Sequence, residues 1–243
     1  MPDLSKLTVE PVPKRIRAMA NGKTVADTLC ASLLLETGKF PVYYVPRQDV
    51  RMDLLDRSDR RESDPGKGDT VWWNLKLGGR VIENAAWSLE APPESAAALA
   101  DTIAFVPDRM DHWFEEDEEV FGHPRDPHHR MDVRPSSRQV RALFNGECIG
   151  QTRRGLFLFE TGLPARYYFP ADDVRRDLLI PSSTRTVCPY KGEASYWSIE
   201  VGDRTAEDAI WVYADPLPEQ PRIRGLYCFD PEKLDRLEVE GET

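Results

Sequence analysis

The segment ETGLPARYYFPADDVRRDLL at residues 160–179 decides the fold, because the chain contains it twice: ETGKFPVYYVPRQDVRMDLL stands at residues 36–55. Sliding residues 17–92 along by 124 positions places them on residues 141–216 without a gap, and 30 of the 76 aligned pairs are identical. A repeat this long has the size of a domain, unlike the periods of about 20–50 residues found in solenoid arrays. The sequence therefore predicts two tandem copies of one domain.

The two copies can be compared position by position. A residue kept in both copies is expected to serve the fold, whereas chemistry present in one copy only indicates where a site survives. On this basis we expect a degenerate site in the first copy, residues 14–114, and the candidate site in the second copy, residues 138–238. The identical pairs include Asn21/Asn145, Gly22/Gly146, Glu36/Glu160, Tyr44/Tyr168, Asp49/Asp173, Lys67/Lys191, Trp73/Trp197 and Trp87/Trp211.

Charge and composition exclude several classes of protein. The chain has 32 Lys and Arg against 42 Asp and Glu, a net charge of −10 that repels nucleic-acid backbones. No apolar run approaches the roughly 20 residues that span a bilayer. Residues 1–15 show no apolar signal-peptide core. We therefore expect a cytoplasmic protein that binds neither nucleic acid nor membrane.

The cysteines give no sign of a metal or a disulfide framework. None of them lies in a CxxC motif, and none is kept in both copies. We expect reduced thiols, no metal site and no cofactor. The four cysteines are Cys30, Cys148, Cys188 and Cys228.

Hydrophobic alternation predicts that each copy is mostly β, with antiparallel strands. In the second copy, alternating runs flank Asn145-Gly146, which is a strong signal for a hairpin turn. Short helical turns are expected after Pro170 and Pro231, and a loop is expected over 180–192. The predicted strands are 138–144, 147–152, 155–160, 165–169, 195–201, 206–214 and 226–229.

Residues 115–137 separate the copies and lack periodicity. The stretch is acidic at first and then rich in proline and basic residues, which is typical of an extended connector. It is long enough for the two domains to pack about a pseudo-twofold axis, as a homodimer would. We expect such intramolecular domain packing in a monomer or a homodimer. The histidines at 123, 128 and 129 lie in this connector, where a polar linker is favoured over a metal site.

The segment CPYKG at 188–192 carries the most distinctive chemistry of the second copy. It would hold the thiol of Cys188, the phenol of Tyr190 and the ammonium of Lys191 on one turn. The first copy has DPGKG at 64–68, which keeps the lysine and glycine but lacks the thiol and phenol. A nearby cation makes a thiol a better nucleophile, so Cys188 is a candidate for catalysis. The alternatives are a wall of a binding pocket, or a buried thiol beside a solvated lysine.

Aromatic residues on separate predicted strands are candidates for pocket walls. They are Tyr167, Tyr168, Tyr196, Trp197 and Trp211. Since residues two apart on a strand share a face, we expect Tyr168 and Trp197 on one surface and Tyr167 and Tyr196 on the other. The alternative is an ordinary β-core, because both tryptophans have counterparts in the first copy.

Glu160 and Glu207 are carboxylates in strand-like segments and have counterparts in the first copy. A buried carboxylate needs a partner, and Arg154 or Lys191 could supply it. Such a pair is more often a structural clamp than a catalytic acid, so both roles stay open for Glu160. Arg153-Arg154 occur in the second copy only, where the first copy has Leu29-Cys30.

These motifs together resemble the domain of unknown function 427 (DUF427) family, over nearly the whole chain. The resemblance is carried by ETGLPARYYFPADDVRRDLL, TRTVCPYKGEASYWSIEVGDR and EDAIWVYADPLPE in the second copy, and by the matching segments of the first. It implies two tandem β-tent domains, a fold whose zinc-binding relatives use CxxC pairs that this chain lacks. The family has no assigned activity, and a nucleotidyltransferase label sometimes attached to it finds no support in these residues.

These observations leave three alternative functions. The first is binding of a small anionic or carbonyl-bearing molecule in an aromatic pocket of the second copy. The second is a cysteine-dependent enzyme with Cys188 as nucleophile, Lys191 or Arg154 stabilising the thiolate and Glu160 accepting a proton. The third is a protein-interaction module. The ligand-binding candidates are Arg154, Tyr167, Tyr190, Tyr196, Trp197 and Trp211.

Overall fold

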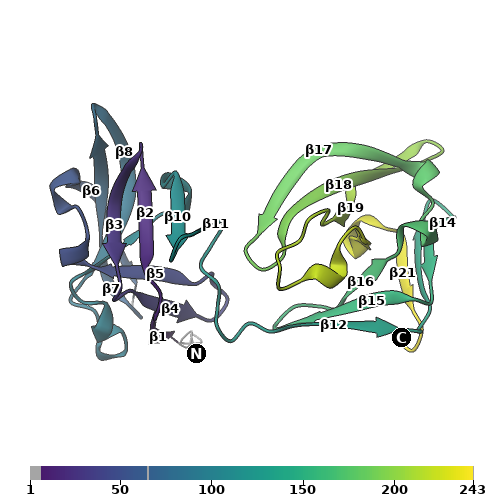
Figure 1. The fold of residues 1–243 in the computed structure, drawn as a ribbon, viewed down its shortest axis with the longest axis horizontal. Helices are drawn as coiled ribbons and strands as arrows, with labels where there is room; N and C mark the ends of the chain where they lie inside the picture. Colours follow the sequence, from purple (N-terminus) through teal and green to yellow (C-terminus); the bar gives the residue numbers. More distant parts are fainter. Residues whose placement is uncertain (1–6, 65, 243) are drawn as a thin grey trace. The chain divides into compact units, whose positions relative to one another are not determined.

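The structure is a computed structural model that describes residues 7–64 and 66–242. The start of the N-terminal segment, and Pro65 of the 64–68 turn, lie outside the described residues. The chain divides between Asp126 and Pro127 into two compact units (Figure 1). Each unit consists of antiparallel sheets and short 3-10 helices, which confirms the prediction of two repeated, mostly β domains.

The first unit has a large and a small sheet. The large sheet has the order β1-β4-β5-β9-β8-β7-β6 and the small one the order β11-β10-β2-β3. The strands of the large sheet are β1 (Leu7–Pro11), β4 (Ser32–Glu36), β5 (Val42–Pro46), β9 (Thr102–Phe105), β8 (Arg80–Glu90), β7 (Gly68–Leu77) and β6 (Leu55–Asp64). Those of the small sheet are β11 (Glu118–Val120), β10 (His112–Glu115), β2 (Ile16–Ala20) and β3 (Lys23–Thr28).

The second unit repeats this topology, except that its small sheet has no counterpart of β11. Its large sheet has the order β12-β15-β16-β20-β19-β18-β17 and its small sheet the order β14-β13-β21. The duplication seen in the sequence is therefore a duplication of chain path. The strands are β12 (Met131–Ser136), β15 (Gly155–Glu160), β16 (Arg166–Phe169), β20 (Tyr227–Phe229), β19 (Arg204–Val212), β18 (Gly192–Val201), β17 (Leu179–Cys188), β14 (Glu147–Thr152), β13 (Val140–Phe144) and β21 (Arg236–Val239).

Short 3-10 helices connect the strands at matching places in the two units. The predicted helical turns after Pro170 and Pro231 are present as such helices. Among the described residues the longest helix has six residues, and none is long and apolar enough to cross a membrane. They are η1 (Arg47–Asp49), η2 (Met52–Leu54), η3 (Glu94–Leu99), η4 (Pro107–Arg109), η5 (Ala171–Asp173), η6 (Arg176–Leu178), η7 (Pro221–Ile223) and η8 (Pro231–Lys233).

The Asn-Gly hairpins form as the sequence predicts. Asn145 and Gly146 have φ angles of +48° and +77°, and Asn21 and Gly22 have φ angles of +48° and +69°. Positive φ at both central residues is the requirement of a type I′ turn, which explains why both copies keep Asn-Gly. The strand before the second turn alternates in burial: in β13, Val140, Ala142 and Phe144 are buried while the residues between them are half-buried.

Each unit buries its main core between the two sheets. In the second unit the small sheet contributes Val140 and Ile149, and the large sheet contributes Ile199, Ile210 and Phe229. The opposite face of the large sheet carries a second cluster, with Tyr168, Cys228 and part of Trp211, and the segment around η7 packs against it. Figure 1 shows the large sheet of this unit as a curved ribbon. Each face of the large sheet therefore packs against another part of the unit.

Two segments differ from the sequence expectation. Residues 180–192, predicted as a loop, form most of the ten-residue strand β17 and the turn into β18. Residues 115–137, predicted as an extended connector, contain β11 and β12. The three strands β11, β12 and β17 are sheet edges, where polar residues and prolines are tolerated because one side needs no ladder hydrogen bonds. Their composition therefore looks like that of loops.

Candidate functional site

Cross-strand register defines one face of the large sheet in the second unit. Tyr168 lies opposite Cys228, Cys228 lies opposite Trp211, and Trp211 lies opposite Tyr196. Residues directly opposite each other project to the same face of a sheet. We call the face that carries Tyr168, Cys228, Trp211 and Tyr196 the ladder face. It is the face away from the main core.

The ladder face corrects the predicted sorting of aromatic residues. Tyr168 and Tyr196 share a face, whereas Tyr167 and Trp197 pack in the main core on the other side. The prediction that Tyr168 goes with Trp197 and Tyr167 with Tyr196 was wrong. Two-residue periodicity relates residues within one strand, whereas the register between strands decides which residues of different strands share a face.

A buried ion pair links two of the predicted catalytic residues. Nζ of Lys191 lies 2.7 Å from Oε2 and 2.9 Å from Oε1 of Glu160, and the two side chains are 11% and 6% exposed. Of the two partners considered for this carboxylate, the structure thus selects Lys191. Glu207, the other carboxylate considered, is exposed.

Glu160 has a second partner from the segment before β12. Nε2 of His129 lies 2.9 Å from Oε1 of Glu160, and the His129 ring packs on Tyr190 with 4.4 Å between centroids. Burial raises the pKa of Glu160, but the hydrogen bonds and charges of Lys191 and His129 outweigh it and hold the pKa below its ordinary value of 4.5. The carboxylate is therefore ionised at neutral pH, which suits a clamp better than a proton acceptor.

The ladder face also carries an arginine that the sequence reasoning missed. The guanidinium of Arg166 lies 5.5 Å from the centroid of the Trp211 ring. It forms no ion pair with any carboxylate in residues 7–64 or 66–242. Trp211 in turn donates its Nε1 hydrogen to the hydroxyl of Tyr168 at 3.4 Å. Comparing the copies could have found Arg166, because Val42 occupies its place in the first copy.

Cys188 ends β17 and is partly buried in the cluster on the ladder face. The backbone N–H of Lys191 donates to the carbonyl of Cys188 at 3.2 Å, so residues 188–191 form a tight turn. A second thiol on this face, Cys228, is fully buried. Burial raises its pKa well above the ordinary value, although Arg166 and Lys191 both act to lower it. Two cations are thus close enough to influence one thiol.

The remaining predicted ligand residues lie elsewhere. Exposed Arg154 donates through Nε and Nη2 to half-buried Asp173 at 3.1 and 2.8 Å, and the pair lines an open hollow away from the ladder face. The hydroxyl of Tyr167 contacts Glu242 at 2.9 Å, and burial together with that carboxylate raises the pKa of Tyr167 to about 12. Trp197 belongs to the main core.

The first unit has the same frame. Lys67 pairs with Glu36 at 2.7 Å, and Trp87 donates to the hydroxyl of Tyr44 at 3.0 Å. The register is also the same, since Tyr44 and Trp87 both lie opposite Ala104. An acid–lysine pair and a tyrosine–tryptophan hydrogen bond are therefore parts of the domain, and they alone do not identify a site.

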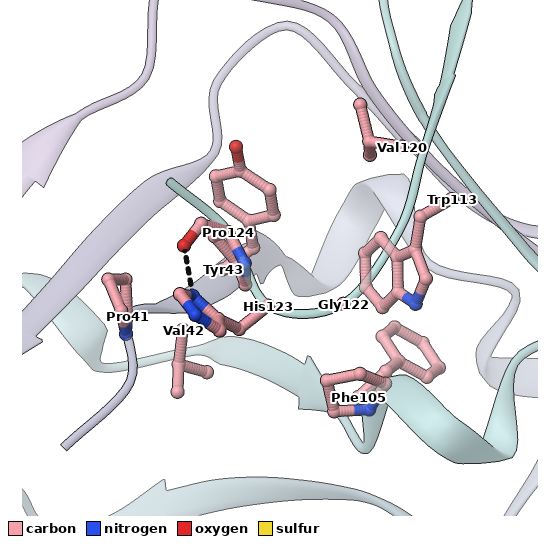
Figure 2. Close-up of a pocket in the computed structure, with 10 residues that line it drawn as sticks. Pro41, Val42, Tyr43, Phe105, Trp113, Val120, Gly122, His123 and Pro124 are labelled. Carbon is pink, nitrogen blue, oxygen red and sulfur yellow. Dashed lines mark hydrogen bonds between the residues drawn. The ribbon is translucent and has the colours of Figure 1, made fainter. Parts of the chain in front are cut away.

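A small cavity lies elsewhere in the first unit, between β5, β10 and residues 120–124. Figure 2 shows the rings of Tyr43, Phe105 and Trp113 around it, with Nδ1 of His123 2.7 Å from the carbonyl of Pro124. Its volume of about 30 Å³ has room for a water or two and no organic ligand. Across the described part of the chain, no three His, Cys, Asp or Glu side chains converge as metal ligands would.

Comparison with known proteins agrees with the residue patterns. The model of a family described as a domain of unknown function (DUF427) matches residues 8–116 and again residues 132–240. The two matches cover most of the chain and fall on the two repeats, which confirms the resemblance inferred from the sequence. No curated protein matches the chain.

Proposed function

The chain belongs to the DUF427 family through both of its halves, and we propose that its second unit binds a small anionic or carbonyl-bearing molecule on the ladder face. The observation that carries this proposal is Arg166, a guanidinium on a strand inside the large sheet. It rests beside Trp211 and has no carboxylate partner in the described chain. The position is occupied by valine in the first copy, so the fold does not require a cation there.

Charge on the ladder face favours an anion. The charge of Lys191 is balanced by Glu160, so Arg166 supplies an excess positive charge. A guanidinium presents a planar fork that matches a carboxylate or a carbonyl oxygen, and charge-assisted hydrogen bonds contribute about 1.5–3 kcal/mol each. The partly exposed rings of Trp211 and Tyr196 offer flat contact area next to it. A planar molecule with an acidic group fits both features.

The proposal uses some of the predicted ligand residues and not others. Tyr196 and Trp211 would contact the ligand. Tyr190, packed on His129, and Lys191, paired with Glu160, would lie at the edge of the site. The hydroxyl of Tyr196, 2.8 Å from Oγ1 of Thr186, is a further polar group on this face. Arg154, Tyr167 and Trp197 have no part in the proposed site. The setting we propose is the cytoplasm, where the four free thiols would stay reduced.

The test is a fragment titration of the full chain followed by the indole N–H signals of its six tryptophans in NMR spectra. Benzoate should shift the Trp211 signal in a saturable manner, and benzamide should do so more weakly. Trp197, on the opposite face of the sheet, is the internal control. Arg166→Val, which restores the residue of the first copy, should weaken benzoate binding about tenfold or more. Unchanged binding in that variant, or equal shifts at Trp197, would refute the proposal.

A further inference from the structure

The first unit contains a cavity, although the sequence predicts only a degenerate site in this copy. It has a volume of about 380 Å³, within the range of small-molecule sites. All its walls come from this unit, chiefly from β4, β5, β6, β7 and β8. The aromatic walls are Tyr44, Trp72 and Trp87, and the charged ones are Glu36, Lys39, Glu62, Asp64 and Lys67. From this cavity we infer that the first unit binds an organic cation, with Arg60 as a built-in competitor.

The aromatic walls are held in a fixed arrangement. The Trp72 and Trp87 rings lie 5.5 Å apart between centroids, and Trp87 meets Tyr44 edge-on at 6.2 Å while donating a hydrogen bond to its hydroxyl. Aromatic faces attract cations, most strongly when the cation is weakly hydrated. Three adjoining rings therefore suit an alkylammonium group, whose methyl surface can contact each ring.

The charged walls are more acidic than those of the second unit. Three carboxylates face two ammonium groups. Burial acts to raise the pKa of Glu36, but Lys39 and Lys67 hold it below its ordinary value. Burial also acts to raise the pKa of Asp64, but the N–H of Gly66 and the charge of Lys67 hold it low. Both acids are thus ionised at neutral pH. In the second unit, Thr186 and Cys188 replace Glu62 and Asp64, and Arg166 replaces Val42.

An intramolecular cation already sits on one of these walls. The guanidinium of Arg60 lies 4.0 Å from the centroid of the Trp72 ring, and its Nε donates to Glu62 at 2.8 Å. The Arg60 guanidinium is a planar organic cation. It contacts one wall residue of the cavity, Trp72, and pairs with another, Glu62. Arg60 is exposed, so a free cation can displace it without disturbing the core. Thr184 stands at this position in the second unit.

The experiment uses phenyltrimethylammonium with the full chain, read through the indole N–H signals of Trp72 and Trp87. The neutral benzyl alcohol is the matched probe. We expect phenyltrimethylammonium to shift both signals in a saturable manner, at least fivefold more tightly than benzyl alcohol, and to leave Trp211 unmoved. Equal binding of the two probes, or the absence of any shift at Trp72 and Trp87, would overturn the inference.

Two variants should change the affinity for phenyltrimethylammonium in opposite directions. Arg60→Thr removes the competitor and should tighten phenyltrimethylammonium binding about fivefold. The double variant Glu62→Gln with Asp64→Asn removes two charges from the walls and should weaken it about tenfold. A weaker or unchanged affinity in Arg60→Thr, or unchanged affinity in the double variant, contradicts the inference. Benzoate binding at Trp211 is a separate readout, so failure of one site does not mask the other.

Discussion

Replacing Lys191 with methionine should destabilise the second unit by about 3 kcal/mol. The variant leaves the carboxylate of Glu160, whose side chain is 6% exposed, without the ammonium group that contacts both of its oxygens. Breaking a buried ion pair by removing one partner costs about 3–5 kcal/mol. The lower value applies because His129 remains within 2.9 Å of Glu160. With a urea dependence of about 1–3 kcal/mol per M, the unfolding midpoint should fall by roughly 1–3 M.

The assay is urea unfolding of the full chain, followed by the indole signals of Trp211 for the second unit and Trp87 for the first. The matched control is Lys67→Met in the first unit. Glu36 keeps a contact with Lys39 at 2.6 Å, so this variant should lose only about 1–2 kcal/mol.

A second control removes the charge of Glu160 as well as its partner Lys191. The double variant Glu160→Gln with Lys191→Met leaves no unpaired carboxylate, so it should recover most of the lost stability. The reasoning fails if Lys191→Met costs less than about 0.5 kcal/mol, or if the double variant is no more stable than that single one.

Three further predictions concern pH, packing and thiol reactivity. Because the pKa of Glu160 is lowered on folding, its pairing stabilises the protein fully above the ordinary value of 4.5, and this contribution is lost as the pH falls through the lower folded pKa. The urea midpoints of wild type and Glu160→Gln should therefore differ at pH 7, and the difference should shrink as the pH is lowered below 4.5. A Cβ added at Gly150 would lie 2.9 Å from the Phe229 ring, so Gly150→Ala should lower stability by about 1–3 kcal/mol in urea unfolding, whereas Ala26→Gly at the matching position creates no clash. Cys228 is fully buried and its pKa is raised by burial, so mass spectrometry should find it unmodified by iodoacetamide under conditions that alkylate the exposed Cys30.

The sequence was most informative where local chemistry determines structure. Asn145-Gly146 predicted the hairpin because few other residue pairs accept two positive φ angles. The duplication predicted that the two copies share one chain path, because copies with matching buried positions favour the same strand order. The pairing of Glu160 with Lys191 could be proposed because a carboxylate on a buried strand needs a partner.

Sequence reasoning failed where neighbouring strands determine the outcome. The face of Trp197 depends on the register of β18 against β19, which the sequence of one strand alone does not determine. The edge strand β17 has the polar composition of a loop, because an edge strand needs only one hydrogen-bonded neighbour. Arg166 could not be singled out from the sequence of its own copy, because one arginine in a strand forms no motif. Its role becomes clear only from its contact with the Trp211 ring and from the absence of a carboxylate partner in the described chain.

The most direct measurement exchanges one residue between the two units. In a chain carrying both Arg166→Val and Val42→Arg, the account predicts that benzoate ceases to shift the indole signal of Trp211 and begins to shift that of Trp87. The common frame of tyrosine, tryptophan and ion pair stays in place, so only the position of the guanidinium changes. If benzoate continues to act on Trp211 as in the wild-type chain, ligand choice does not depend on that position and the account is contradicted.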